Sequence, residues 1–115
     1  MRDPGETSGA ATGPAATNQV RLGGRLLERG VLRHTPAGVA VLDFRLAHCS
    51  IQPEVGGERR VEVELACIAF EHLAQALAAV PLGTALCLGG FLAARSRKSA
   101  SPVLHTVTME FIEGS

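Results

Sequence analysis

The chain has 115 residues and a hydrophobic content of 46%, which suffices for one domain with a modest core. Its 11 basic and 11 acidic side chains give a formal net charge of zero, so any basic surface must be local and a binder that relies on a general cationic excess is excluded. No apolar run approaches the roughly 18 residues that span a bilayer, and the N-terminus lacks the apolar segment of a signal peptide. We therefore expect a cytoplasmic protein with no membrane partner.

The first 17 residues are rich in Gly, Ala, Pro and Thr and contain no Leu, Ile, Val or Phe. Such a segment cannot contribute to a core, so residues 1–17 are predicted to form a flexible tail ahead of a domain over residues 18–115. The first periodic stretch of that domain contains the pair Gly23-Gly24. A double glycine inside a strand is typical of a bulge or a sharp bend in a barrel.

Alternating apolar and polar residues predict three strands, over residues 18–32, 39–51 and 61–68. The segments between them contain Pro and Gly and are predicted to be a turn at 34–38 and a mobile hairpin loop at 53–60. The first half of the chain is thus a series of antiparallel strands.

The pattern changes after the third strand. Residues 70–80 are rich in alanine and place apolar side chains at helical spacing, and Pro81 with Gly83 gives a stop signal. Two further strands are predicted over residues 84–94 and 103–112. The order strand, strand, strand, helix, strand, strand predicts an all-β fold with one short helix: a five-stranded Greek-key barrel of the oligonucleotide-binding (OB) type.

A short basic loop joins the last two predicted strands and contains Arg95, Arg97 and Lys98. Small barrels that bind an anionic strand are often completed in this way, so nucleic acid is the first partner to consider. On an arbitrary protein the same charges would be a solvated turn. The candidate nucleic-acid-binding residues are Arg95, Arg97, Lys98, Arg59, Arg60, Arg45, Arg33 and His34.

Cysteines and histidines predict neither a metal centre nor catalysis. Cys49, Cys67 and Cys87 are odd in number, lack CxxC spacing and lie in apolar stretches, which favours reduced core thiols. The four histidines lie in different predicted elements without ligand spacing. No phosphate loop or nucleophile with an adjacent base is present. We expect no cofactor, no metal and no enzymatic activity.

Several short motifs occur in an order and spacing that match a known family across nearly the whole chain outside the tail. They are Ala37-Gly38, Phe44, His48-Cys49-Ser50-Ile51-Gln52, Gly90-Phe91-Leu92 and Val103-Leu104-His105. In these the chain resembles the family of primosomal replication protein N, the B component of the bacterial replication-restart primosome. The resemblance implies a homodimeric OB fold related to single-stranded DNA-binding protein. It also implies binding to single-stranded DNA, to the primosomal helicase and to other primosome proteins, with stimulation of the helicase at stalled forks.

The chain departs from the enteric members of that family on the DNA-facing sheet. Where they carry an aromatic residue early in the third strand and an arginine late in the second, this chain has Glu62 and Cys49. Asp43, Arg45, Glu62 and Glu64 share one strand parity, so acidic neighbours are expected to neutralise Arg45. With four phenylalanines and no Trp or Tyr, the stacking platform is expected to be lost and DNA binding to be weak and salt-sensitive.

Two alternatives to a restart factor remain open. One is an OB-fold protein–protein interaction module with little DNA binding, which only the basic loop argues against. The other is a general single-stranded DNA-binding protein. Such proteins normally end in an acidic tail, whereas the sequence given stops at Ser115 directly after its last predicted strand.

Overall fold

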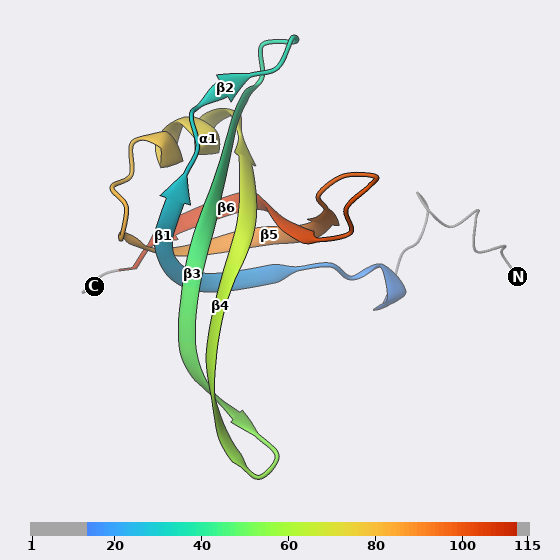
Figure 1. Ribbon diagram of the computed structural model, residues 1–115, viewed down its shortest axis with the longest axis vertical. Coiled ribbons are helices and arrows are strands. Elements are labelled where there is room, and N and C mark those ends of the chain that lie inside the picture. Colours follow the sequence, from blue (N-terminus) through green and yellow to red (C-terminus); the bar gives the residue numbers. More distant parts are fainter. Residues whose placement is uncertain (1–13, 113–115) are drawn as a thin grey trace, which may run out of the picture.

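Five long strands close into a barrel in the computed structural model, which describes residues 14–112 (Figure 1). In chain order the elements are η2 (Pro14–Ala16), β1 (Val20–Arg29), β2 (Arg33–His34), β3 (Ala40–Glu54), β4 (Gly57–Phe70), α1 (Glu71–Ala78), β5 (Ala85–Ala94) and β6 (Pro102–Phe111). The predicted all-β OB barrel with one short helix is confirmed, and β2 is an additional two-residue strand. Of the flexible tail predicted over residues 1–17, residues 1–13 lie outside the described residues.

The barrel closes because β1 pairs with two strands. The order around the barrel is β1–β5–β6–β4–β3, and β3 returns to β1. Residues 20–25 of β1 pair with β5, and residues 25–29 pair with β3. The β4–β6 pair is parallel and the other pairs are antiparallel, so the barrel is mixed.

A glycine permits the change of partner in β1. A Cβ atom on Gly24 would lie 2.4 Å from the carbonyl oxygen of Ala47 on β3, so the backbones approach more closely than a side chain allows. The Nδ1 atom of His48 lies 2.6 Å from the carbonyl oxygen of Gly23 and adds a side-chain link between the same strands. The bulge in β1 lies further along the strand, between Leu26 and Glu28. The glycine pair thus marks a close approach, not the bulge itself.

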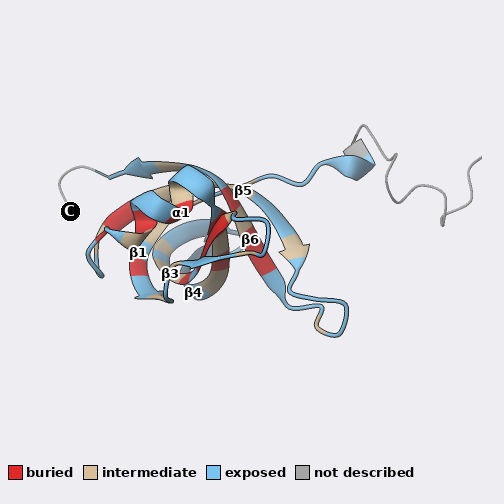
Figure 2. Cartoon of the chain, turned by 90° about the horizontal axis from the view of Figure 1, so that it is seen from above, coloured by how far each residue is buried: buried red, intermediate tan, exposed pale blue. Residues whose placement is uncertain are grey.

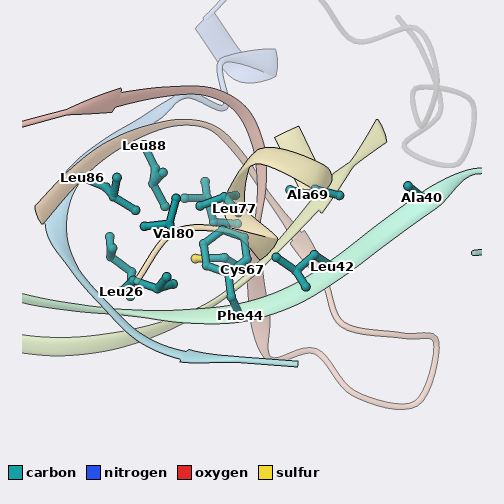
Figure 3. Close-up of a cluster of buried hydrophobic side chains, with 13 residues drawn as sticks. Leu26, Ala40, Leu42, Phe44, Cys67, Ala69, Leu77, Val80, Leu86 and Leu88 are labelled. Carbon is teal, nitrogen blue, oxygen red and sulfur yellow. The ribbon is translucent and has the colours of Figure 1, made fainter. Parts of the chain in front are cut away.

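The core follows the alternation expected from the sequence. Leu42, Phe44 and Leu46 of β3 are buried, whereas Asp43 is exposed and Arg45 is half-buried on the outer side. Figure 3 shows Leu42 and Phe44 directed into the barrel among the other buried side chains. Burying each large aliphatic or aromatic side chain contributes about 1.5–3 kcal/mol, so this face fixes the register of β3.

The helix α1 packs against β3, β4 and β6, and Figure 2 shows buried and exposed residues along it. Its residues Ala74 and Leu77 are fully buried. Glu71 at its start has a φ of +54° and its carboxylate accepts a hydrogen bond of 2.8 Å from the backbone N–H of Ala40. The helix predicted over residues 70–80 is confirmed, and Pro81 follows its end. Within residues 14–112, no helix has the length and apolar character needed to cross a membrane.

The hairpin predicted at residues 53–60 is confirmed, but the expectation that these residues form a long loop is wrong. β3 and β4 continue to a two-residue turn at Val55-Gly56, with Gln52 opposite Arg59 and Glu54 opposite Gly57. Gly56 and Gly57 have φ values of +90° and +142°, which a side chain would disfavour, and these allow the tight reversal. The resulting hairpin projects well beyond the barrel (Figure 1).

Two smaller expectations also change. The first strand ends at Arg29, not near residue 32, because the chain leaves β3 after Gly30 and pairs with it again only at Arg33. Cys67 is a buried core thiol as predicted, and desolvation by burial raises its pKa to about 12. Cys49 is exposed, because it lies on the outer side of β3 in the projecting hairpin, so the core expectation is wrong for it.

The close contact at Gly24 generates a stability prediction. Gly24→Ala should lower the free energy of unfolding by about 1–3 kcal/mol, because the new methyl group overlaps backbone that cannot move aside. Gly23→Ala is the matched control, since its Cβ would meet the Ile112 side chain at 3.4 Å and the Leu86 carbonyl oxygen at 3.9 Å, both ordinary van der Waals contacts. Urea denaturation of both variants measures the difference. Equal losses of stability would contradict this account of barrel closure.

Candidate nucleic-acid interface

A groove crosses the outer side of β3 and β4 and reaches the ends of β5 and β6. We call it the central groove; its lining residues are Glu28, Arg29, Gly30, Asp43, Phe44, Arg45, Ala66, Cys67, Ile68, Ala94, Arg95, Val103 and His105. Most of the lining side chains from β3 and β4 occupy the alternate strand positions that face away from the core. Barrel closure therefore creates the groove, because it brings β1, β3, β4 and the β5–β6 connection to one surface.

Three arginines line the central groove, and they differ in their partners. Arg45 lies 3.8 Å from Glu64, so the predicted neutralisation by an acidic neighbour is confirmed. The Arg29 guanidinium donates to the carbonyl of Val80. For Arg95, no carboxylate among residues 14–112 lies within salt-bridge distance. Arg95 is thus the groove cation most available to an anionic ligand.

The loop between β5 and β6 is held by its own hydrogen bonds. The backbone N–H of Arg95 donates to the carbonyl of Ser101 at 2.9 Å. The hydroxyl oxygen of Ser96 accepts from the backbone N–H groups of Lys98 and Ser99 at 3.2 and 3.1 Å, a pattern that serine commonly forms in turns. Arg97 and Lys98 are exposed, and no described carboxylate lies within salt-bridge distance of either. The loop presents three cations beside the groove.

The other predicted site residues are dispersed. Arg33 is paired with Asp43 at 2.9 Å at the edge of the groove, and His34 is exposed on β2. Arg59 and Arg60 lie on the projecting hairpin, where they form ion pairs of 2.6 Å with Glu54 and Glu62 respectively. Raised pKa values of both guanidinium groups follow from these hydrogen-bonded carboxylates. The structure therefore groups Arg45, Arg95, Arg97 and Lys98 and separates the hairpin arginines from them.

A second hollow lies beneath the projecting hairpin, against the start of β1. Its lining includes His48, Cys49, Arg60 and Glu62. His48 is already bonded through Nδ1 to β1 and lies with Nε2 2.8 Å from the Ser50 hydroxyl. Within residues 14–112, no three His, Cys, Asp or Glu side chains come together as metal ligands would. The lining also includes Arg25, whose guanidinium donates to the carbonyl of Gly83 and has no carboxylate among residues 14–112 within salt-bridge distance. The hollow thus holds one cation without a described acidic partner and an imidazole that is already engaged.

Sequence reasoning missed an aromatic group beside the central groove. The rings of Phe91 on β5 and His105 on β6 are stacked, with centroids 5.0 Å apart and an interplanar angle of 20°. Phe70 lies on β4 with its centroid 6.1 Å from that of His105. We call these three residues the ring cluster. The register between β5 and β6 brings Phe91 to His105, and the parallel pairing of β4 with β6 brings Phe70 near them. The alternation of each strand alone reveals neither register.

Known proteins match this chain over nearly all of its barrel. The model of a family described as "another single-strand binding protein family" matches residues 18–108. The replication restart protein PriB of Bordetella pertussis is 42% identical over 98 residues, which are 85% of this chain and 92% of that protein. The PriB of Nitrosomonas europaea is 38% identical over 88 residues, covering 76% of this chain and 82% of its own.

Solved structures agree with the sequence matches. A structure of PriB from Ralstonia solanacearum superposes with a TM-score of 0.75 at 33% identity and covers 84% of this chain and 98% of that one. The single-stranded DNA-binding protein of Thermus aquaticus superposes with a TM-score of 0.68 at 26% identity, covering 85% of this chain and 51% of that one. The family resemblance inferred from the motifs is confirmed. The chain belongs to the PriB family of replication restart proteins, whose OB fold is shared with single-stranded DNA-binding proteins.

Proposed function

We propose that this protein is a single-stranded DNA-binding accessory factor of replication restart, which bridges the DNA and the primosomal helicase at stalled forks and stimulates the helicase. The observation that carries the proposal is the basic loop: Arg95 lines the central groove, and Arg97 and Lys98 follow it in the chain. No carboxylate among residues 14–112 lies within salt-bridge distance of these three cations. The relatives are named as replication restart proteins, which supports the same role. The role is one of binding rather than chemistry, and it places the protein with the chromosome in the bacterial cytoplasm.

The groove is suited to a phosphate backbone that passes from the basic loop toward β3. Each phosphate that a cation neutralises releases a counterion, which makes such binding favourable at low salt and weaker as salt rises. Glu28 and Asp43 also line the groove, and Glu64 is paired with Arg45, so these carboxylates weaken the attraction of the groove for an anionic strand. We therefore expect modest affinity with a clear salt dependence.

The projecting hairpin offers a separate surface for protein contact. Ile51, Val55 and Val63 are exposed there, and Val55 at the tip is fully so. Exposed aliphatic side chains at the end of an extended hairpin contribute nothing to the barrel core and are suited to contact with another protein. We assign the helicase to this side of the molecule and the DNA to the central groove.

A second candidate function is supported by the ion pairs. Arg21, Arg33, Arg45, Arg59 and Arg60 each have a carboxylate within 4.0 Å, so much of the basic surface is neutralised. That arrangement favours an OB-fold interaction module with little DNA binding. The two functions differ in whether the β5–β6 loop contacts phosphate.

Removing the loop cations decides between these functions. Changing Arg95, Arg97 and Lys98 together to alanine should weaken oligothymidylate binding and flatten its log–log salt slope by about 0.7 per lost phosphate contact. Fluorescence anisotropy at several salt concentrations measures both quantities. The control changes Arg59 and Arg60 to alanine, which removes two paired cations on the projecting hairpin, outside the groove, and should leave the slope nearly unchanged. An unaltered slope in the loop variant would favour the interaction module.

Contact with the helicase should survive conditions that release DNA. Because exposed apolar side chains do not depend on counterion release, a pull-down of the cognate primosomal helicase should persist at a salt concentration that abolishes oligonucleotide binding. Nuclease treatment of the same samples removes any bridging strand. Simultaneous loss of both interactions would argue that DNA alone connects the two proteins.

We also propose a homodimer formed through β1. Residues 20–24 of β1 pair with β5 on one edge, and among residues 14–112 no strand pairs with their other edge. An open edge is a template for pairing with a second strand, and a two-fold axis would let each chain cover the other. Light scattering at micromolar concentration should give twice the 12.0 kDa of one chain. A monomer mass at that concentration would overturn the dimer.

A further inference from the structure

We propose that the ring cluster is a base-stacking site for single-stranded nucleic acid, continuous with the central groove. This inference rests on the proposed DNA-binding function and adds to it a site that binds bases rather than phosphates. Phe91, His105 and Phe70 come from three different strands and meet on the outside of the barrel. The expectation that the stacking platform is lost applies to the position of Glu62, whereas the ring cluster lies on another part of the surface.

The rings and the groove share a residue. His105 lines the central groove and is stacked on Phe91 at 5.0 Å. Ile68, the parallel partner of His105 on β4, lines the groove as well. A strand whose phosphates contact Arg95 in that groove would therefore carry its bases past His105 and onto the neighbouring rings.

The rings of Phe91 and Phe70 differ in solvent exposure from the core residue Phe44. Phe91 and Phe70 are each 41% exposed, whereas Phe44 is 3% exposed and packs inside the barrel. A partly exposed aromatic ring keeps one face available to a partner, and every base has a π-face that can stack on it. The outer rings thus provide the sequence-tolerant contacts that a phosphate-binding loop cannot provide.

Charge favours nucleic acid over a protein as the occupant. Arg95 lines the groove on the side of the rings, and Arg97 and Lys98 follow it in the same loop. No carboxylate among residues 14–112 lies within salt-bridge distance of these three cations. Aromatic rings beside a cationic groove are the combination by which proteins bind single strands without sequence preference.

A bulge in β6, opposite two glycines of β5, sets this arrangement. Gly89 pairs with Thr108 but Gly90 pairs with Thr106, so one extra residue of β6 is accommodated at this point. A Cβ on Gly90 would lie 1.9 Å from the carbonyl oxygen of His105, which shows how closely the two backbones approach. After the shift Phe91 lies directly opposite His105. Without the bulge the two rings would not face each other.

The absence of tryptophan from the sequence allows a direct test. Phe91→Trp places the only tryptophan of the chain in the ring cluster, and its fluorescence should be quenched as oligothymidylate is added, in step with the anisotropy change. Phe111→Trp is the matched control, because Phe111 is also exposed on a barrel strand but lies at the end of β6, opposite Leu86, and takes no part in the ring cluster. Its fluorescence should change little during the same titration.

Affinity provides a second readout. Phe91→Leu keeps an apolar side chain but removes the ring, and it should weaken oligothymidylate binding about tenfold. Its salt slope should match that of the unmodified protein, because no phosphate contact is lost. Phe111→Leu should bind as the unmodified protein does. Thermal unfolding of each variant identifies any loss that comes from misfolding, and the folded Phe91→Trp variant then decides the question.

Two negative results have different meanings. If the unmodified protein fails to bind oligothymidylate at low salt, the DNA-binding function fails and the stacking site fails with it. If the unmodified protein binds but the fluorescence of the Phe91→Trp variant is not quenched and Phe91→Leu binds equally well, DNA binding stands and the stacking site is overturned. In that case the rings form a face for a protein partner.

Discussion

The architecture depends on the close approach between Gly24 of β1 and the carbonyl oxygen of Ala47 on β3. At this point β1 leaves β5 and joins β3, and without that exchange the sheet would have two open edges instead of a closed barrel. Closure buries Leu26 and fixes which side of β3 faces outward. The outer side then contains Arg45, so the position of the central groove follows from a contact between two backbones.

The chain has no net charge, but its basic side chains differ in whether a carboxylate lies beside them. Exposed ion pairs such as those of Arg59 and Arg60 each contribute only about 0–1 kcal/mol to stability, yet each one removes a cation from the surface that an anionic ligand would meet. The loop between β5 and β6 is different, because its serine hydroxyls and backbone groups satisfy one another and leave the cations to solvent. The nature of each arginine's neighbour, rather than the number of arginines, therefore defines the candidate site.

Much of the fold could be predicted from the sequence because strand alternation and helix stop signals are local. The buried face of β3, the end of α1 before Pro81 and the pairing of Arg45 with an acidic neighbour all follow from residues close together or from strand parity. The hairpin after the second strand could be predicted, but the length of its strands could not be, since Pro, Gly and charged residues are compatible with both a long loop and a tight turn. The ring cluster could not be predicted either, because a one-residue bulge in β6, opposite Gly89 and Gly90, sets the β5–β6 register.

Three loop cations and three rings would make a binder with two components that respond differently to salt. With about 0.7 log unit per phosphate, three contacts give a slope near 2, so raising salt from 50 to 200 mM would weaken that component by about twentyfold. Stacking on Phe91 does not depend on counterion release and would persist as the phosphate contacts weaken. A protein built in this way holds a single strand at few points and releases it readily. That behaviour suits a factor that passes the strand to a helicase better than one that coats it.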